Sequence, residues 1–476
     1  MIMDKNTVAN LIKTKADKSE MLAKQIWEYA ELNFREKQSA DLLCSALKDE
    51  GFTIETPLCG INTAFCASYG SGGPVIAYLG EYDALSGLSQ KAATAQKCPV
   101  NVGAPGHGCG HNLLGAGSFA AAAALKDYIV QNHINATVKF FGCPAEEDGS
   151  GKTYMAQNHC FDDASAVFTW HPSVANYTAG TGTLAVTGIL YSFEGVAAHA
   201  AANPFAGRSA LDACELMNVG CNYLREHIIP EARLHYAYRD VGGTAPNVVQ
   251  ASASVHYYIR APHVAEMLDI AKRVLDVAKG AALMTGTKLN VKIIDGVSDY
   301  LPNKTLSTLL NDCMAEVGAP QFDENDYALA AEFANTIDKA QRDSNLSHEC
   351  TSINTSAAYF ENKILHEDIP PLYYNLRYAE PGSTDVGDVS CTAPTAQCYY
   401  ACMALGTGSH SWQMTAQANS PIAMKGMHKA SEALLLAGIK AIASPQLLEE
   451  AKAELAKALP NGYSCPMPKG TKPEFN

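Results

Sequence analysis

Two histidines and a cysteine lie within five positions of a glycine-rich stretch, APGHGCGHNLLG, at residues 104–115. Glycines separate His107, Cys109 and His111, and an alanine-rich segment of helical composition follows them. Nothing in so short a loop can bury three such side chains. Imidazole and thiolate are ligands that zinc and neighbouring first-row metals accept. The spacing therefore predicts that Cys109 and His111 hold metal.

More acids and imidazoles follow short apolar segments elsewhere in the chain. They are Glu81 and Asp83 after PVIAYLG, Glu146 and Glu147 after ATVKFFGC, His171 after ASAVFTW, and His410 after YYACMALGTGS. Open α/β sheets bind ligands at the carboxyl ends of their strands. We expect these side chains to meet at one edge of a sheet, beside the loop of Cys109 and His111.

The two adjacent glutamates offer different chemistry. One carboxylate can coordinate a metal while the other accepts a proton from an activated water molecule. Neighbours in an extended segment point in opposite directions, so Glu146 and Glu147 need not do the same work. A helix N-terminus with two favourable acids remains the alternative for EEDGSGK taken alone.

The elements that must position these residues alternate between strand and helix. PVIAYLG, ATVKFFGC and ASAVFTW are short, nearly continuous apolar runs, typical of strands buried on both faces. NLLGAGSFAAAAALKDYIVQ and GKTYMAQNHCF between them have helical composition, and the first thirty-odd residues show helical periodicity. This order predicts an α/β fold with a mostly parallel sheet flanked by helices.

The pattern changes near Gly180. GTLAVTGILYSFEGVAAH, VVQASASVHYYIRAP and KLNVKIIDGV alternate as half-exposed antiparallel strands do, and two helical segments separate them. Strand–helix–strand–helix–strand suits an inserted α+β domain of split-βαβ, ferredoxin-like type. After Tyr300 the α/β character resumes. We expect a discontinuous catalytic domain, 1–180 with 298–476, and an inserted domain, 181–297.

Composition narrows the function classes. The chain has 476 residues, 47% hydrophobic and 18% charged, with a formal net charge of −14. This charge argues against nucleic-acid binding, which needs a surplus of lysine and arginine. The start is charged, no uninterrupted apolar run reaches membrane-spanning length, and the 15 cysteines show no paired spacing. We expect a cytoplasmic protein with reduced thiols and no membrane partner.

The motifs GHGCGHN, CPAEEDGSGK, GSTDVGDVS and GSHSWQ occur in the order found in a known family. The chain resembles the aminoacylase-type metallopeptidases and amidohydrolases that hold two metals per site. The similarity is greatest to the branch of p-aminobenzoyl-glutamate hydrolases, and it runs from about Ala16 to Ile442.

This resemblance implies a site. The family's metal ligands fall on Cys109, His111, Glu147, His171 and His410, and its catalytic acid/base falls on Glu146. Asp83 matches an aspartate that supports the metal centre. His107 is not a ligand in relatives and is interpreted as a supporting or structural residue. His428 competes with His410, but it lies in a predicted amphipathic helix rather than after a strand. For Asp385 and Asp388 we expect support of the metal histidines.

The insertion carries further resemblances. GVAAHAAANPFAGRSALDA is similar to the family's lid motif, whose histidine, here His199, reaches the substrate carbonyl of a partner subunit. Asn247 in GGTAPNVV falls in a loop that relatives use for substrate contacts. Arg260 matches an arginine that clamps a substrate carboxylate; a plain strand-end charge is the alternative. The resemblance also implies homodimerisation through the lid.

The expected reaction is metal-dependent hydrolysis of a small-molecule amide, with two Zn²⁺ or Mn²⁺ ions. The favoured substrate is p-aminobenzoyl-glutamate or a similar aroyl- or acyl-glutamate. One alternative is an aminoacylase or dipeptidase acting on other N-acyl or β-alanyl amino acids. Another is a non-catalytic subunit paired with a homologous second chain, although the intact Glu146 and full ligand set disfavour it.

Overall fold

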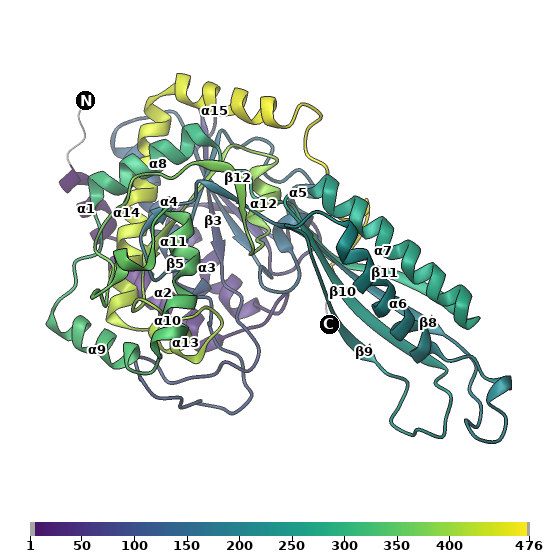
Figure 1. Cartoon of the computed structure of the whole chain (residues 1–476). Helices are drawn as coiled ribbons and strands as arrows, with labels where there is room; N and C mark the ends of the chain where they lie inside the picture. Colours follow the sequence, from purple (N-terminus) through teal and green to yellow (C-terminus); the bar gives the residue numbers. More distant parts are fainter. Residues whose placement is uncertain (1–4, 474–476) are drawn as a thin grey trace.

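The computed structural model describes residues 5–473. Within them the strands form a seven-stranded sheet in the main body, a four-stranded sheet that projects from it, and a two-stranded sheet. Figure 1 shows the projecting unit, β8 to β11 with helices α6 and α7, extending away from the body. The two-stranded sheet pairs β7 (Thr181–Thr183) with β12 (Asn375–Glu380) in parallel.

The seven-stranded sheet has a parallel centre. Its strands, in spatial order, are β1 (Thr53–Glu55), β2 (Phe65–Tyr69), β4 (Thr137–Cys143), β3 (Val75–Glu81), β5 (Ala166–Ser173), β13 (Thr395–Ala401) and β6 (Tyr177–Thr178). The four neighbours β4, β3, β5 and β13 run parallel, and the outer strands pair antiparallel. The predicted α/β fold with a mostly parallel sheet is confirmed.

Helices cover both faces of this sheet. On one face Tyr78, Phe140 and Trp170 join a core with the helices of the N-terminal segment and with α4 and α14. On the other face Leu79 and Phe141 pack in a separate core with α5 and α12. Alternate residues of each strand thus enter different cores, and this explains why the strands are apolar throughout.

The helices of the body are α1 (Lys5–Lys13), α2 (Ala16–Tyr29), α3 (Lys37–Asp49), α4 (His111–Gln131), α5 (Gly151–Gln157), α8 (Lys304–Val317), α9 (Glu324–Ala334), α10 (Lys339–Asn345), α11 (Ser347–Ser352), α12 (Val386–Ser390), α13 (Trp412–Gln417), α14 (Pro421–Ala443) and α15 (Pro445–Ala458). The N-terminal periodicity thus belongs to separate helices, α1 and α2, which a turn at residues 14–15 joins.

Helix α4 is the central helix of the body. Its alanines let it lie close to the sheet, and a Cβ at Gly115 would come within 2.6 Å of the Glu81 carbonyl oxygen. Among the described helices, α4 has the length and composition of a membrane span, but 78% of its apolar window is buried in the molecule. Core packing therefore accounts for its apolar character.

The projecting unit has one more strand than the sequence pattern predicts. Its sheet has the order β11 (Lys288–Val297), β8 (Ala185–Glu194), β10 (Ser252–Ala261), β9 (Arg233–Asp240), with helices α6 (Ala210–Leu224) and α7 (Val264–Thr285). The prediction of strand–helix–strand–helix–strand was wrong, because it missed β9. This edge strand is mostly exposed, so the burial signal that marks the other strands is weak in it.

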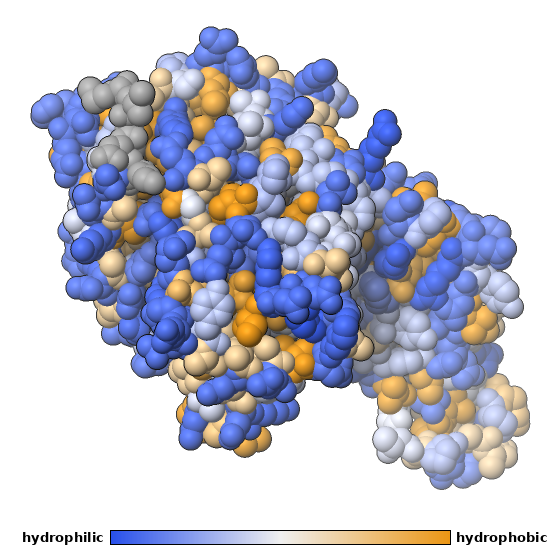
Figure 2. All heavy atoms as spheres, turned by 60° about the vertical axis from the view of Figure 1, so that its left-hand side comes forward, coloured by the Kyte–Doolittle hydropathy of each residue, from blue (hydrophilic) through white to orange (hydrophobic). Residues whose placement is uncertain are grey.

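The projecting unit also exposes large apolar side chains. Phe205, Tyr223, Leu283 and Met284 are 66–86% exposed. Figure 2 shows apolar atoms gathered toward the far end of the smaller part at the right of the view. An exposed apolar surface of this kind is typical of an interaction site.

Candidate metal centre

The glycine-rich loop places its side chains at the carboxyl edge of the parallel strands. Helix α4 begins at His111, and Gly110 before it has a φ of 81°, a left-handed conformation that glycine adopts without strain. The His410 amide donates to the Gly108 carbonyl over 2.9 Å. This backbone bond joins two loops that lie some 300 residues apart in the chain.

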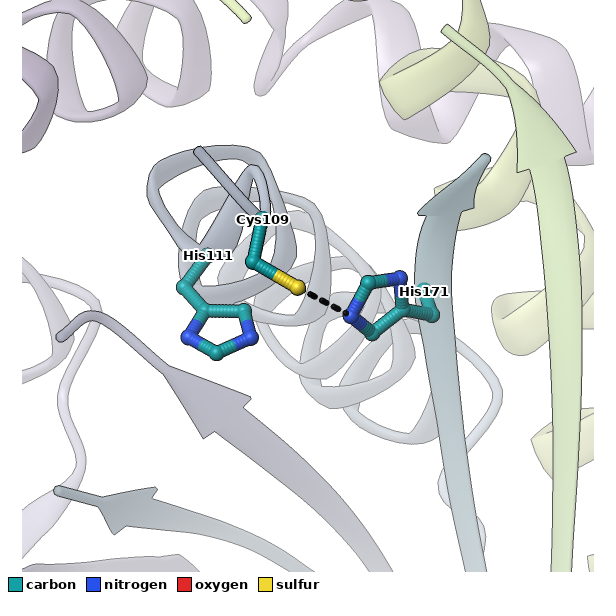
Figure 3. A group of neighbouring side chains, drawn as sticks. All are labelled: Cys109, His111 and His171. Carbon is teal, nitrogen blue, oxygen red and sulfur yellow. Dashed lines mark hydrogen bonds between the residues drawn. The ribbon is translucent and has the colours of Figure 1, made fainter. Parts of the chain in front are cut away.

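Cys109 and His171 are in direct contact. The Cys109 Sγ lies 3.4 Å from the His171 Nε2 (Figure 3). The His171 Nδ1 is 2.8 Å from the Pro172 carbonyl oxygen and donates to it, so Nε2 is left with a lone pair that faces the thiol. His171 lies within β5 rather than after it, because the strand continues to Ser173.

His111 is held by a carboxylate on one side and faces further carboxylates on the other. Its Nδ1 donates to the Asp83 Oδ1 over 2.7 Å. Its Nε2 lies 3.3 Å from a Glu81 oxygen and 3.9 Å from oxygens of Glu146 and Glu147. A carboxylate behind a histidine fixes its tautomer and raises its basicity, as in many metal sites.

Glu147 links the loop that carries His410 to His111 and Asp83. Its amide donates to the Asp83 Oδ2 over 2.9 Å, and one carboxylate oxygen lies 3.2 Å from the His410 Nε2. The His410 side chain is 54% exposed and stands at the opening of the site, whereas His111 and Asp83 are fully buried. These side chains thus extend from the core to solvent. They are called the cluster below and comprise Glu81, Asp83, Cys109, His111, Glu146, Glu147, His171 and His410.

The donor atoms suit divalent cations. His111 Nε2 and Glu147 Oε1 are buried and lack a hydrogen-bond partner. Unpaired buried polar atoms are costly, so two of them aimed at one space indicate a missing partner. Among residues 5–473, three groups have donor atoms that lie within 4.8 Å of one another inside each group: Cys109–His111–His171, Cys109–Glu147–His410 and Glu81–His111–Glu146. Sets that share members fit two neighbouring ions, and thiolate, imidazole and carboxylate are first-row metal ligands.

The electrostatics of the cluster point to cations as well. Burial, followed by the charges of Glu81 and Glu147, raises the pKa of Glu146 well above its usual range. Burial also raises the pKa of the Cys109 thiol and lowers that of His171 to about 4. A bound cation would reverse the thiol's preference and favour the thiolate.

A buried lysine lies behind the cluster. The Lys152 Nζ is 2.7 Å from a Glu81 oxygen and 2.5 Å from the Asp385 Oδ1, and all three side chains are at most 2% exposed. Asp388 accepts from Thr153 and Ser298. The expectation that Asp385 and Asp388 support the metal histidines was wrong: Asp385 contacts Lys152, and Asp388 ties α5 to the residue after β11.

The cluster opens into a cavity of about 340 Å³ that Arg260 also lines. The Arg260 guanidinium donates to the Ser383 hydroxyl over 2.7 Å. A larger cavity of about 730 Å³, beside α15, contains none of the clustered side chains. The smaller cavity is therefore the one in which the clustered groups could act on a ligand.

Two predicted residues lie away from this cavity in the single chain. His199 and Asn247 are exposed on the projecting unit, where a hydrogen bond from the Ala200 amide to the Asn247 carbonyl joins their loops. The role predicted for His199 needs a partner subunit, and both assignments stay predictions.

The other histidines considered have different surroundings. The His107 Nε2 donates to the Ile26 carbonyl over 2.9 Å, and the ring is buried beside the loop. His428 lies in α14 and contacts Glu20. Of the two competing histidines, His410 is the one that reaches the cluster.

Sequence reasoning missed one participant and gave another no role in the site. Glu81 was noted at a strand end, but not as a group facing His111, and Lys152 was not considered. A lysine in the first turn of a helix normally points to solvent, so the type of residue gave no signal. Its pairing with Glu81 and Asp385 depends on contacts between segments more than 70 residues apart.

Known proteins resemble this chain in sequence and in fold. Residues 78–377 match the model described as peptidase family M20/M25/M40. The chain is 43% identical to one of the subunits of p-aminobenzoyl-glutamate hydrolase from Escherichia coli K12 over 95% of both chains. It is 29% identical to Xaa-Arg dipeptidase of Mus musculus, over 94% of this chain and 91% of the relative. The crystal structure of a dinuclear metal-binding M20 peptidase from Bacillus subtilis shares the fold, with a TM-score of 0.55 and 16% identity, over 90% of this chain and 99% of the other.

Proposed function

The chain belongs to peptidase family M20/M25/M40 and is a metal-dependent amidohydrolase, and we propose that it hydrolyses p-aminobenzoyl-glutamate or a similar aroyl- or acyl-glutamate. The similarity to the Escherichia coli p-aminobenzoyl-glutamate hydrolase chain supports this substrate class. The similarity to Xaa-Arg dipeptidase favours a dipeptidase as the second candidate, acting on other N-acyl or β-alanyl amino acids.

The ligand set is the first part of the proposal. Cys109, His111, Glu147, His171 and His410 would hold two divalent ions, Zn²⁺ or Mn²⁺, with Asp83 fixing His111. Bound ions would supply Lewis-acid polarisation of the amide carbonyl and a lower pKa for the attacking water. The two unpartnered atoms, His111 Nε2 and Glu147 Oε1, support this assignment.

Glu146 carries the proton transfers in this proposal. It lines the cavity, and burial together with the charges of Glu81 and Glu147 raises its pKa. It accepts a proton from the attacking water and then delivers it to the leaving amine. The proposed function depends on one observation: Glu146 lines the same cavity as the candidate ligands, and one of its oxygens lies 3.9 Å from the His111 Nε2.

We assign substrate selection to residues of the projecting unit, among them Arg260 where the unit meets the cavity. Arg260 would pair with a carboxylate of the amino-acid part, and its position in the cavity supports this. His199 and Asn247 of a second subunit would complete the site, with residues 181–297 acting as lid and dimerisation domain. The exposed apolar side chains of this unit support a homodimer or a complex with a homologous second subunit. We place the protein in the cytoplasm.

The test is Glu146→Gln in the full chain. We expect the variant to keep its metal content and to lose about 10²- to 10⁴-fold in kcat on p-aminobenzoyl-glutamate, because the amide cannot accept the proton. Elemental analysis and product release measure the two properties. Glu361→Gln, an exposed site, is the control. Retained turnover in Glu146→Gln would refute the assignment.

A further inference from the structure

A second group of polar side chains lines the same cavity, beyond the candidate metal ligands. His348 and Glu349 belong to α11, and Glu380 ends β12. None of the three is among the candidate ligands. They lie outside the glycine-rich loop, the loop after β4 that carries Glu146, and strand β5, which carries His171.

Two carboxylates in this group are buried, and they differ in the hydrogen bonds that they accept. Glu380 is 6% exposed, accepts from the Thr181 and Ser352 hydroxyls, and pairs with His348. Glu349 is 7% exposed, and its Oε2 accepts no hydrogen bond. Glu349 lines the cavity, and a buried carboxylate oxygen without a hydrogen-bond donor is costly unless a ligand supplies one.

Two tyrosines form a wall between this pair of acids and the metal-site candidates. The rings of Tyr177 and Tyr399 stack with centroids 4.4 Å apart, and Tyr399 lies 5.8 Å from the His171 ring. The Tyr177 hydroxyl is 3.2 Å from the His348 Nε2. Aromatic faces attract cations and the positive ends of N–H bonds, so the wall favours the same kind of ligand as the two acids.

The cavity therefore has groups of opposite charge in different places. Arg260 lines it together with Glu349 and Glu380, and the two acids are not paired with that arginine. A ligand that satisfies both needs a carboxylate and, elsewhere, a nitrogen that donates hydrogen bonds. Ordinary acyl-amino acids without such a nitrogen would leave the Glu349 oxygen unpaired.

We propose that Glu349 and Glu380, with the Tyr177–Tyr399 wall, form a subsite for a nitrogen donor of the substrate, an amine or ammonium group. This inference rests on the proposed function and specifies its substrate. The nitrogen can come from the acyl part, as an aryl amine, or from the amino-acid part, as a basic side chain. In either case Glu349 is a specificity residue and not part of the proton transfer.

Two matched substrate pairs test the subsite in the metal-loaded full chain. The first compares p-aminobenzoyl-glutamate with benzoyl-glutamate, and the second compares benzoyl-lysine with benzoyl-norleucine. Because a hydrogen bond to a charged group is lost in the analogue, we expect the nitrogen-bearing member of one pair to have a kcat/KM about tenfold higher or more. The pair that shows the preference identifies the source of the nitrogen.

Glu349→Gln should reduce that preference to about threefold or less, because the neutral amide no longer offers a charged acceptor to the nitrogen. Glu361→Gln should keep the preference. Isothermal titration of the wild type and Glu349→Gln with 4-aminobenzoate and benzoate, or with lysine and norleucine, gives a readout that does not depend on turnover. Equal kcat/KM within both pairs, or an unchanged preference in Glu349→Gln, would overturn the subsite. Absence of turnover on all four compounds, with preferential binding of the nitrogen-bearing ligand, would instead contradict the proposed function alone.

Discussion

At the scale of single residues, the site depends on carboxylates that act behind other side chains. Asp83 contacts both His111 and the Glu147 backbone, so one side chain sets the position of two candidate ligands. Lys152 neutralises Glu81, which would otherwise add another unpaired negative charge to the buried cluster. Such contacts fix the ligands before any cation arrives.

Replacing Asp83 should therefore weaken metal binding more than it weakens folding. In Asp83→Asn the amide accepts poorly and no longer fixes the His111 tautomer, so we expect metal affinity to fall about 10- to 100-fold. Competition with a chromophoric chelator measures this affinity. Asp41→Asn, at an exposed site, should bind as the wild type does. Equal affinity in Asp83→Asn would show that His111 is not positioned by this carboxylate.

A histidine outside the cluster should make stability depend on pH. Burial lowers the pKa of His366 from 6.5 to about 4, and its Nδ1 accepts the Asn176 amide hydrogen over 3.0 Å. The unfolded chain binds this proton more tightly, so the contribution is present above pH 6.5 and is lost as the pH falls toward 4. Lowering the pH from 7 to 5 should therefore reduce the free energy of unfolding by about 2 kcal/mol.

Denaturant titrations at these two pH values test this contribution. His366→Gln keeps an acceptor for the Asn176 amide, so its unfolding free energy should fall by about 2 kcal/mol less than that of the wild type over the same interval. The exposed His227→Gln should follow the wild type. An identical pH response in His366→Gln would mean that His366 is not buried in its neutral form.

At the scale of elements, the approach of α4 to β3 brings His111 to the acids. Gly115 faces the Glu81 carbonyl, and Gly117 faces the Trp170 ring. Small residues in this helix thus serve the site as well as the core. The sequence marks the helix clearly, but its distance from the sheet is set by packing on both sides.

Gly115→Ala tests this approach. The added Cβ would lie 2.6 Å from backbone, so the helix must move away, and we expect a loss of about 1–3 kcal/mol in unfolding free energy together with weaker metal binding. Gly280→Ala in α7 meets nothing within 4 Å and should be neutral or stabilising by up to about 1 kcal/mol. Thermal unfolding and metal titration measure both. A Gly115→Ala variant with wild-type affinity would contradict the role of the close approach.

At the level of the whole molecule, the cluster joins five parts of the chain: the end of β3, the glycine-rich loop, the loop after β4, strand β5, and the loop before α13. The bound ions would hold these parts together, while the projecting unit reaches away from the body (Figure 1). Metal binding should therefore be coupled to the stability of the body as a whole.

Removal of metal should lower the unfolding temperature of the chain. A ligand held at 100 times its dissociation constant stabilises the folded state by about 2.7 kcal/mol, and chelation removes this contribution. Calorimetry with chelator, and then with restored Zn²⁺ or Mn²⁺, measures it. His171→Ala, which lacks one donor, should respond less than the wild type. Equal unfolding temperatures with and without chelator would speak against a metal site.

Features of the fold and site that leave a local pattern could be predicted from the amino-acid sequence. Buried strands show as apolar runs, α4 as an alanine-rich segment, and the groups at strand ends as polar residues where apolar ones stop. The sequence also indicated that Cys109, His111, Glu146, Glu147, His171 and His410 gather, because parallel strands end at one edge. Strand β9 escaped notice because an exposed edge strand buries too little to leave such a pattern.

Which side chains face one another could not be predicted from the sequence and became visible in the folded chain. The pairing of Lys152 with Glu81 and Asp385, the unpartnered oxygen of Glu349, and the distance of His199 from the cavity depend on contacts between distant segments. No period or spacing in the chain encodes those contacts. They follow from how helices pack on a sheet, where shifts of an ångström decide whether a charge is paired.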